Sequence, residues 1–195
     1  MNAFYDWFGM NQEIFYAVNG WHGPLIDALM LTGTAVGDFR NMPWILGAIL
    51  LAIAFQQLFP FNAERLPSLP GLKQLLMRLM LGYMVTAGTV ALLKIGLDMP
   101  RPSAVLPSGR VTVLALPESR HSFPSGHSAF AMLIMTMFWP LLTIRDRLLL
   151  AVMTLWVGLS RINVGAHFPA DVLAGYVCGT VGGLLANKAV MSRLR

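Results

Sequence analysis

Charged residues are scarce in this chain. Only 12% of its 195 residues are Asp, Glu, Lys or Arg, whereas 56% are hydrophobic. An ordinary soluble domain carries about a quarter charged residues, so the composition excludes a typical water-soluble monomer and favours a membrane protein. The formal net charge is +5. Because the cations are scattered or confined to short motifs, a phospholipid surface explains them better than a nucleic acid does.

Cysteine is almost absent as well. Cys178 is the single cysteine, which excludes an intrachain disulfide. With four histidines and no cysteine pair, the sequence lacks a zinc-ligand pattern. We therefore expect no metal and no cofactor. The first twenty residues have neither a basic start nor a continuous apolar core, so we also expect no cleavable signal peptide.

What the chain has instead is a series of long apolar stretches. Those of about the length that crosses a bilayer are residues 43–60, 75–97, 124–143, 147–164 and 169–187. A weaker stretch at 22–37 is counted as a sixth span. Residues 1–20 place large apolar side chains at helical spacing, which predicts an interfacial anchoring helix. The expected fold is all-α: one membrane domain over 1–195, a polytopic bundle of about six transmembrane helices.

Loop cations predict the orientation of this bundle. With six spans, one side collects the cations that have no evident chemical role, namely Arg65, Lys73, Arg145, Arg147, Lys188, Arg193 and Arg195. This side should face the cytoplasm, with both termini inside and the chain in the inner membrane. The sequence carries no signal of an oligomeric state.

Three polar clusters interrupt the apolar segments, at 94–102, 124–127 and 160–171. Under the six-span assignment all three lie on the extracytoplasmic side. Lys94, Arg101 and Arg161 are the cations of this set, and together they would hold a dianion such as a phosphate. A pocket of cations without an anion would repel itself, so its ligand should be negative.

The second cluster, Pro124-Ser125-Gly126-His127, begins a helix. The free amides and positive dipole of a helix start form an anion site. Gly126 allows the backbone to approach the ligand, Ser125 adds a hydroxyl, and His127 could protonate a leaving oxygen.

The third cluster pairs a histidine with a carboxylate. Asp171, in the first turn of the last helix, can accept a hydrogen bond from the ring N–H of His167 and leave the other nitrogen free to attack phosphorus.

Taken singly, each cluster has an ordinary explanation: a lysine reaching the interface from a helix end, a loop, or an arginine on a lipid phosphate. A His–Asp pair can also bind metal. His121 could line the mouth of the cavity or lie in a solvated loop.

The joint pattern Lys94-x6-Arg101-Pro102, Pro124-Ser125-Gly126-His127 and Ser160-Arg161-x5-His167-x3-Asp171 resembles the type 2 phosphatidic acid phosphatase superfamily. The resemblance covers about 94–171 and implies a six-helix membrane bundle that hydrolyses phosphate esters without metal, through a phosphohistidine. By position, His167 would be the nucleophile, Asp171 its orienting partner and His127 the general acid. The residues that would hold the phosphate oxygens are Lys94, Arg101, Ser125, Gly126 and Arg161.

The expected partner is a lipid phosphate in the membrane. Undecaprenyl diphosphate is the first choice, ahead of phosphatidylglycerophosphate, phosphatidate and lipid A phosphate. A lipid phosphotransferase using the same site is the alternative, and an anion or lipid transporter is a more distant one. Asn163 and Phe168 depart from residues common in the superfamily, which predicts an altered pocket wall.

Overall fold

The computed structural model describes residues 3–59, 67–107, 109–114 and 119–192, and every regular element among them is helical. The N-terminal half contains α1 (Ala3–Asp6), η1 (Trp7–Gly9), α2 (Met10–Asn19), α3 (Pro24–Val36), η2 (Phe39–Asn41) and α4 (Met42–Leu58). The remainder contains α5 (Leu69–Leu97), α6 (Pro102–Val105), α7 (Gly126–Phe138), η3 (Trp139–Leu141), α8 (Ile144–Asn163) and α9 (Pro169–Ser192). The all-α expectation is confirmed.

Three helical stretches of the described chain are long and apolar enough to cross a membrane: Phe39–Leu58, Leu69–Val105 and Pro169–Ser192. Pro24–Val36 and Gly126–Leu141 are apolar but shorter. The outward faces of the three long stretches carry many exposed large apolar side chains, for example Leu51, Leu92 and Val177. Such surfaces are favourable against lipid and costly against water.

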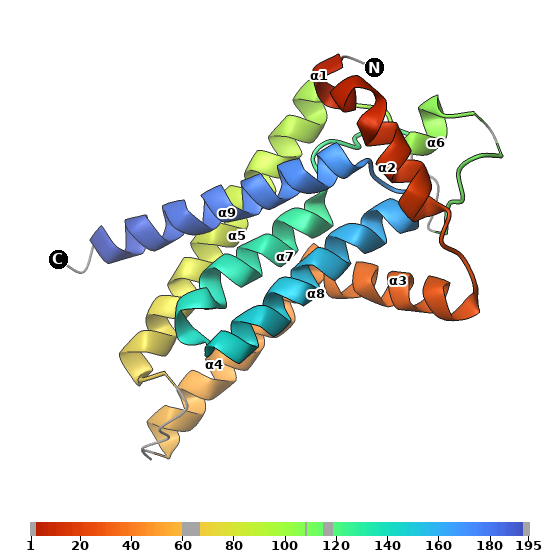
Figure 1. Cartoon of the computed structure of the whole chain (residues 1–195). Coiled ribbons are helices and arrows are strands. Elements are labelled where there is room, and N and C mark those ends of the chain that lie inside the picture. The colour runs from red at the N-terminus through yellow and green to blue at the C-terminus, as the bar shows by residue number, and fades with distance from the viewer. Residues whose placement is uncertain (1–2, 60–66, 108, 115–118, 193–195) are drawn as a thin grey trace.

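Helices α5, α7 and α9 pack against one another at the centre of the bundle (Figure 1). Glycine makes the contact between α7 and α9 close. A Cβ added to Gly175 would overlap the Ser125 carbonyl oxygen, and one added to Gly179 would overlap the carbonyl oxygen of Ala129. Gly175 and Gly179 have the four-residue spacing of small residues that lets two helices approach closely. This contact holds the start of α7, with its histidine, against the start of α9.

Gly179→Ala should lower the unfolding temperature of the protein in detergent, because the new methyl group forces the two helices apart. Overpacking of this kind costs about 1–3 kcal/mol. Gly88→Ala is the matched control, because a Cβ at this helical glycine of α5 meets nothing within 4 Å. That substitution should leave stability unchanged or raise it by about 0.5–1 kcal/mol. Equal melting temperatures for the two variants would contradict the packing described here.

Helix α3 differs from the span expected over 22–37. It has 13 residues, which at 1.5 Å per residue gives about 20 Å, short of the roughly 30 Å of a bilayer core. Its Gly33 packs on Trp156 and Ser160, and Met30 packs near Val164. Helix α3 therefore lies along the last turns of α8 at one end of the bundle instead of running its full length.

The N-terminal segment lies at one end of the bundle. Helices α1 and α2 cover the end where α9 begins, and α9 runs from there to the C-terminal end (Figure 1). The described parts of the two termini thus lie at opposite ends of the bundle. The placement of both termini on the cytoplasmic side of a membrane stays a prediction. Arg65, Arg193 and Arg195, used in that prediction, lie outside the described residues.

Candidate active site

A cavity of about 480 Å³ opens at the end of the bundle where α5 ends and α7 begins. Its lining is rich in cationic and imidazole side chains and consists of Thr34, Asp38, Arg40, Lys94, Arg101, Ser103, Val113, His121, Gly126, His127, Arg161, Gly165, Ala166 and His167. Six of the eight residues predicted for the site line this cavity. Ser125 and Asp171 do not, and both are fully buried beside it.

The turn between α8 and α9 holds His167 against the cavity. The backbone N–H groups of Ala166 and His167 both donate to the carbonyl oxygen of Arg161, at 3.2 and 3.1 Å. Gly165 has a φ of 76°, in the left-handed region where glycine carries no side-chain penalty. A Cβ there would overlap the Thr112 carbonyl oxygen. The sharp turn thus aims the imidazole of His167 while keeping it only 2% exposed.

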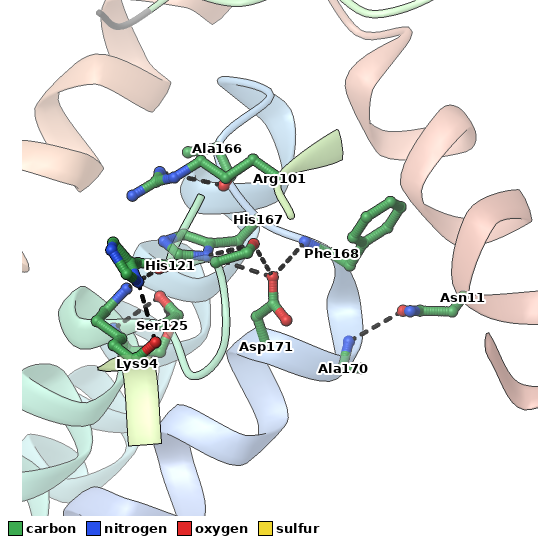
Figure 2. Close-up of polar contacts among 12 residues, drawn as sticks. Asn11, Lys94, Arg101, His121, Ser125, Ala166, His167, Phe168, Ala170 and Asp171 are labelled. Carbon is green, nitrogen blue, oxygen red and sulfur yellow. Dashed lines mark hydrogen bonds and ion pairs between the residues drawn. The ribbon is translucent and has the colours of Figure 1, made fainter. Parts of the chain in front are cut away.

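Asp171 fixes the orientation of that imidazole (Figure 2). Its Oδ2 lies 3.3 Å from His167 Nδ1 and accepts hydrogen bonds from the Phe168 N–H at 3.0 Å and the Ser122 hydroxyl at 2.5 Å. Its Oδ1 accepts from the Tyr5 hydroxyl at 2.6 Å. Both oxygens of this buried carboxylate are therefore satisfied. With Nδ1 engaged by Asp171, Nε2 is the ring nitrogen left for chemistry at the cavity.

Burial lowers the pKa of His167 to about 3; the Arg161 guanidinium adds to this shift and the hydrogen bond to Asp171 opposes it. The imidazole is therefore uncharged at neutral pH, with a lone pair available to attack an electrophile.

His127 lies in the first turn of α7. Ser125 caps this helix: its Oγ accepts hydrogen bonds from the Ser128 N–H at 3.5 Å and the Ser128 hydroxyl at 3.0 Å. Ser125 therefore caps α7 and does not line the cavity. The sequence motif alone could not distinguish this capping role from the predicted phosphate binding. Gly126 does line the cavity. The N-terminal end of α7 therefore faces the cavity, where its amides and positive dipole favour an anion.

The three cations predicted for the site come together in the cavity (Figure 2 shows two of them). Lys94 Nζ donates to the carbonyl oxygen of His121, and Arg101 Nη1 donates to that of Ala166 at 3.3 Å. Arg161 Nη1 donates to Thr34 Oγ1 at 3.2 Å. An ammonium carries three donors and a guanidinium five, so these side chains are suited to the several oxygens of a phosphate. His121 also lines the cavity, which agrees with the first of its two interpretations, the cavity mouth.

The N-terminal segment is a part of the site that sequence reasoning missed. Besides the Tyr5 contact, Asn11 Oδ1 accepts from the Ala170 N–H at 3.0 Å, at the start of α9. Phe15 is fully buried against Phe168. The exposed face of the segment still carries Phe8, consistent with an interfacial helix. Its other face completes the surroundings of Asp171.

Two residues predicted to line the pocket wall lie instead between the N-terminal segment and the rest of the bundle. Asn163 is fully buried, and its Nδ2 donates to the carbonyl oxygens of Val18 and Trp21. Phe168 is fully buried between Tyr5 and Phe15. Neither lines the cavity. The prediction of an altered wall is corrected: both residues fasten the N-terminal segment to the bundle.

Tyr5→Phe should lower kcat about tenfold with KM little changed, because one hydrogen bond to the carboxylate is lost while substrate contacts stay. A net hydrogen bond to a charged group is worth about 1.5–3 kcal/mol. Burial and the nearby Asp171 raise the pKa of Tyr5, so the hydroxyl remains a donor at any working pH. Tyr16→Phe is the control, since Tyr16 lies in the same segment and contacts Phe15 and Arg110. Equal kinetics for the two variants would contradict a role for the Tyr5 hydroxyl.

Comparison with known proteins gives consistent matches. The family model described as the PAP2 superfamily matches residues 75–195. A lipid A 1-phosphatase of Rhizobium johnstonii is 42% identical over 64 residues, 33% of this chain and 26% of that protein. One of Rhizobium etli is 43% identical over 58 residues, 30% of this chain and 25% of its own length. The matched region thus spans about a quarter of these curated relatives.

Solved structures resemble the whole fold. The crystal structure of Aquifex aeolicus LpxE matches with a TM-score of 0.72 and 27% identity, covering 92% of this chain and 95% of that one. The transmembrane PAP2-type phosphatidylglycerolphosphate phosphatase of Bacillus subtilis matches with a TM-score of 0.65 and 23% identity, covering 100% of this chain and 89% of that one. The second likeness concerns the fold alone.

Proposed function

Because this chain belongs to the PAP2 superfamily, we propose that it is a membrane lipid phosphatase that works through a phosphohistidine on His167. One observation carries the proposal. The Asp171-bound imidazole of His167 opens on the same cavity as His127 and the cations Lys94, Arg101 and Arg161.

In the first step, Nε2 of His167 attacks phosphorus and the bond from phosphorus to the leaving oxygen breaks. His127 gives its proton to that oxygen, so the lipid leaves as an alcohol, or as a phosphate if the substrate is a diphosphate. The cations and the amide end of α7 hold the equatorial oxygens, where the transition state carries its charge. Asp171 stabilises the positive imidazole that forms.

In the second step, water attacks the phosphohistidine and the N–P bond breaks. The now neutral His127 takes the proton of this water, inorganic phosphate is released, and both histidines return to their starting states. Each residue thus serves both half-reactions, with no added reactant except water. Transfer of the phosphoryl group to a lipid hydroxyl in place of water would make the same site a phosphotransferase.

Lipid A 1-phosphate is the first substrate to test, because two relatives carry that activity in their names and the LpxE fold covers nearly the whole chain. Undecaprenyl diphosphate, the first choice from the sequence, comes next, followed by phosphatidylglycerophosphate and phosphatidate. We further propose that the chain lies in the inner membrane with the cavity extracytoplasmic. Support comes from Lys73, Arg145 and Lys188, cations of helix ends remote from the cavity.

The deciding experiment presents these four lipids to the purified protein in detergent and measures phosphate release. A parallel reaction with labelled substrate, stopped without acid, should contain a phosphohistidine that is absent from the His167→Ala protein. Activity should survive EDTA, because the proposed mechanism uses no metal. No release from any lipid and no labelled protein would refute the phosphatase, and label passed to an added acceptor lipid would favour the transferase.

A further inference from the structure

The end of α3 comes unusually close to the second histidine of the cavity. A Cβ added to Gly37 would overlap Val157 Cγ1 and would lie 3.3 Å from the Cβ of His127. Glycine at this position therefore lets the chain pass directly beside the start of α7. The next residue, Asp38, enters the cavity lining as a result.

Asp38 is a carboxylate with two sets of neighbours. Its Oδ1 accepts from the Arg40 N–H at 2.8 Å, and Oδ2 accepts from Arg40 Nε at 3.0 Å and Nη2 at 2.6 Å. The same Oδ2 lies 4.0 Å from His127 Nε2. Hydrogen bonds from Arg40 lower the pKa of Asp38. The carboxylate is therefore ionised at neutral pH, with its negative charge beside the imidazole.

The other charged and titratable groups near His127 are two cations and the uncharged imidazole of His167. Arg161 from α8, His167 from the turn before α9 and Lys94 from α5 all face it across the cavity. Arg161 and Lys94 suit a bound phosphate, but burial and these two cations disfavour the proton on His127 that the general acid must carry. Asp38 supplies the opposing charge. Arg40 offsets it only in part, since its side chain is 90% exposed and its charge is screened by water.

We propose that Asp38 is the positioning residue of the general acid: its charge opposes the surroundings that disfavour a proton on His127, and it aims Nε2 at the leaving oxygen. The inference rests on the phosphatase function proposed above. At 4.0 Å the contact exceeds a hydrogen bond, so Asp38 acts through its charge. The site then has two carboxylate–histidine pairs with opposite tasks, one for a neutral nucleophile and one for a protonated acid.

This role is tested with two soluble substrates that differ in how much they need an acid. Octyl phosphate releases an alkoxide, which must be protonated, whereas 4-nitrophenyl phosphate releases a stable phenolate. Asp38→Asn should lower kcat/KM for octyl phosphate about tenfold, which is part of the roughly 10²–10⁴-fold that general-acid catalysis contributes, and change it less than about twofold for 4-nitrophenyl phosphate. The alkaline limb of the octyl phosphate pH profile should move to lower pH.

Two control variants separate this role from a structural one. Asp27 lies in α3, the helix that precedes Asp38, and Asp27→Asn removes a carboxylate that also pairs with a histidine, His22, at 2.9 Å. It should leave both rates unchanged. Arg40→Gln removes the partner of Asp38 but keeps the carboxylate, so the ratio of the two rates should stay that of the wild type.

The outcomes distinguish the inference from the function on which it rests. If the wild type hydrolyses neither substrate nor any lipid of the panel, the phosphatase proposal fails first. If the wild type is active and Asp38→Asn lowers both rates equally, or neither, the role of Asp38 is refuted and the phosphatase stands. That role is also refuted if Arg40→Gln reproduces the change in ratio, because the loop tether would then explain it.

Discussion

Replacing His167 with alanine should abolish phosphate release, with a loss of at least about 10⁴-fold in kcat, because the group that forms the covalent bond is gone. The substitution removes a side chain that is only 2% exposed, so a small cavity and a modest loss of stability are expected as well. Phosphate release from the preferred lipid, measured in the same detergent for both proteins, checks the rate. Circular dichroism and size-exclusion profiles equal to those of the wild type show that the fold persists.

His22→Ala is the control for the loss of a histidine as such. His22 is partly exposed and pairs with Asp27 at 2.9 Å outside the cavity lining. It should retain wild-type turnover. A folded His167→Ala protein with near-normal phosphate release would show that His167 is not the nucleophile. His127 would then become the candidate for that role.

The gathering of the three polar clusters could be predicted from the sequence because each cluster lies at an end of an apolar helix. Helices that traverse a membrane can place such ends only at one surface or the other. The structure brings Lys94, His127 and His167 to one cavity, as expected. The pairing of His167 with Asp171 was equally accessible, since four residues along a helix start place two side chains within reach.

The contribution of the N-terminal segment could not be predicted in the same way. Tyr5 and Asp171 are separated by 166 positions, and helical periodicity indicates an apolar face without naming what covers it. The apolar spacing of residues 1–20 was compatible with lipid on one side, which is what an interfacial helix needs. That the opposite face would close over a buried carboxylate is a tertiary contact, visible only once the helices are packed.

The short length of α3 has a local reason. Pro24 favours a helix start, and Gly37 lies next to a residue that must approach His127. Between these two limits only about four turns of helix fit. Hydropathy counted the stretch at 22–37 as a crossing, and whether this 13-residue helix crosses a bilayer stays a prediction.

Asp171→Asn should keep the fold and lose about 10²–10⁴-fold in kcat, because it removes the charge and little else. The buried carboxylate faces donors on both oxygens. An asparagine can place its carbonyl oxygen toward Phe168 N–H and the Ser122 hydroxyl, and its amide toward Tyr5, whose hydroxyl can rotate to accept. What the amide cannot do is stabilise the positive phosphoimidazole of the intermediate, and comparable substitutions in serine proteases cost about 10⁴ in rate.

A double-mutant cycle with Tyr5→Phe makes this prediction sharper. If the Tyr5 hydroxyl acts through the carboxylate of Asp171, its removal should cost about tenfold in the wild type and almost nothing in the Asp171→Asn background. Kinetics of the four proteins in one detergent measure that coupling. Additive losses would mean that Tyr5 acts independently of Asp171, for instance by seating the N-terminal segment. Coupling would instead mean that Tyr5 of the N-terminal segment acts on catalysis through the buried carboxylate of Asp171. Displacing this segment from the membrane surface would then also weaken the nucleophile His167.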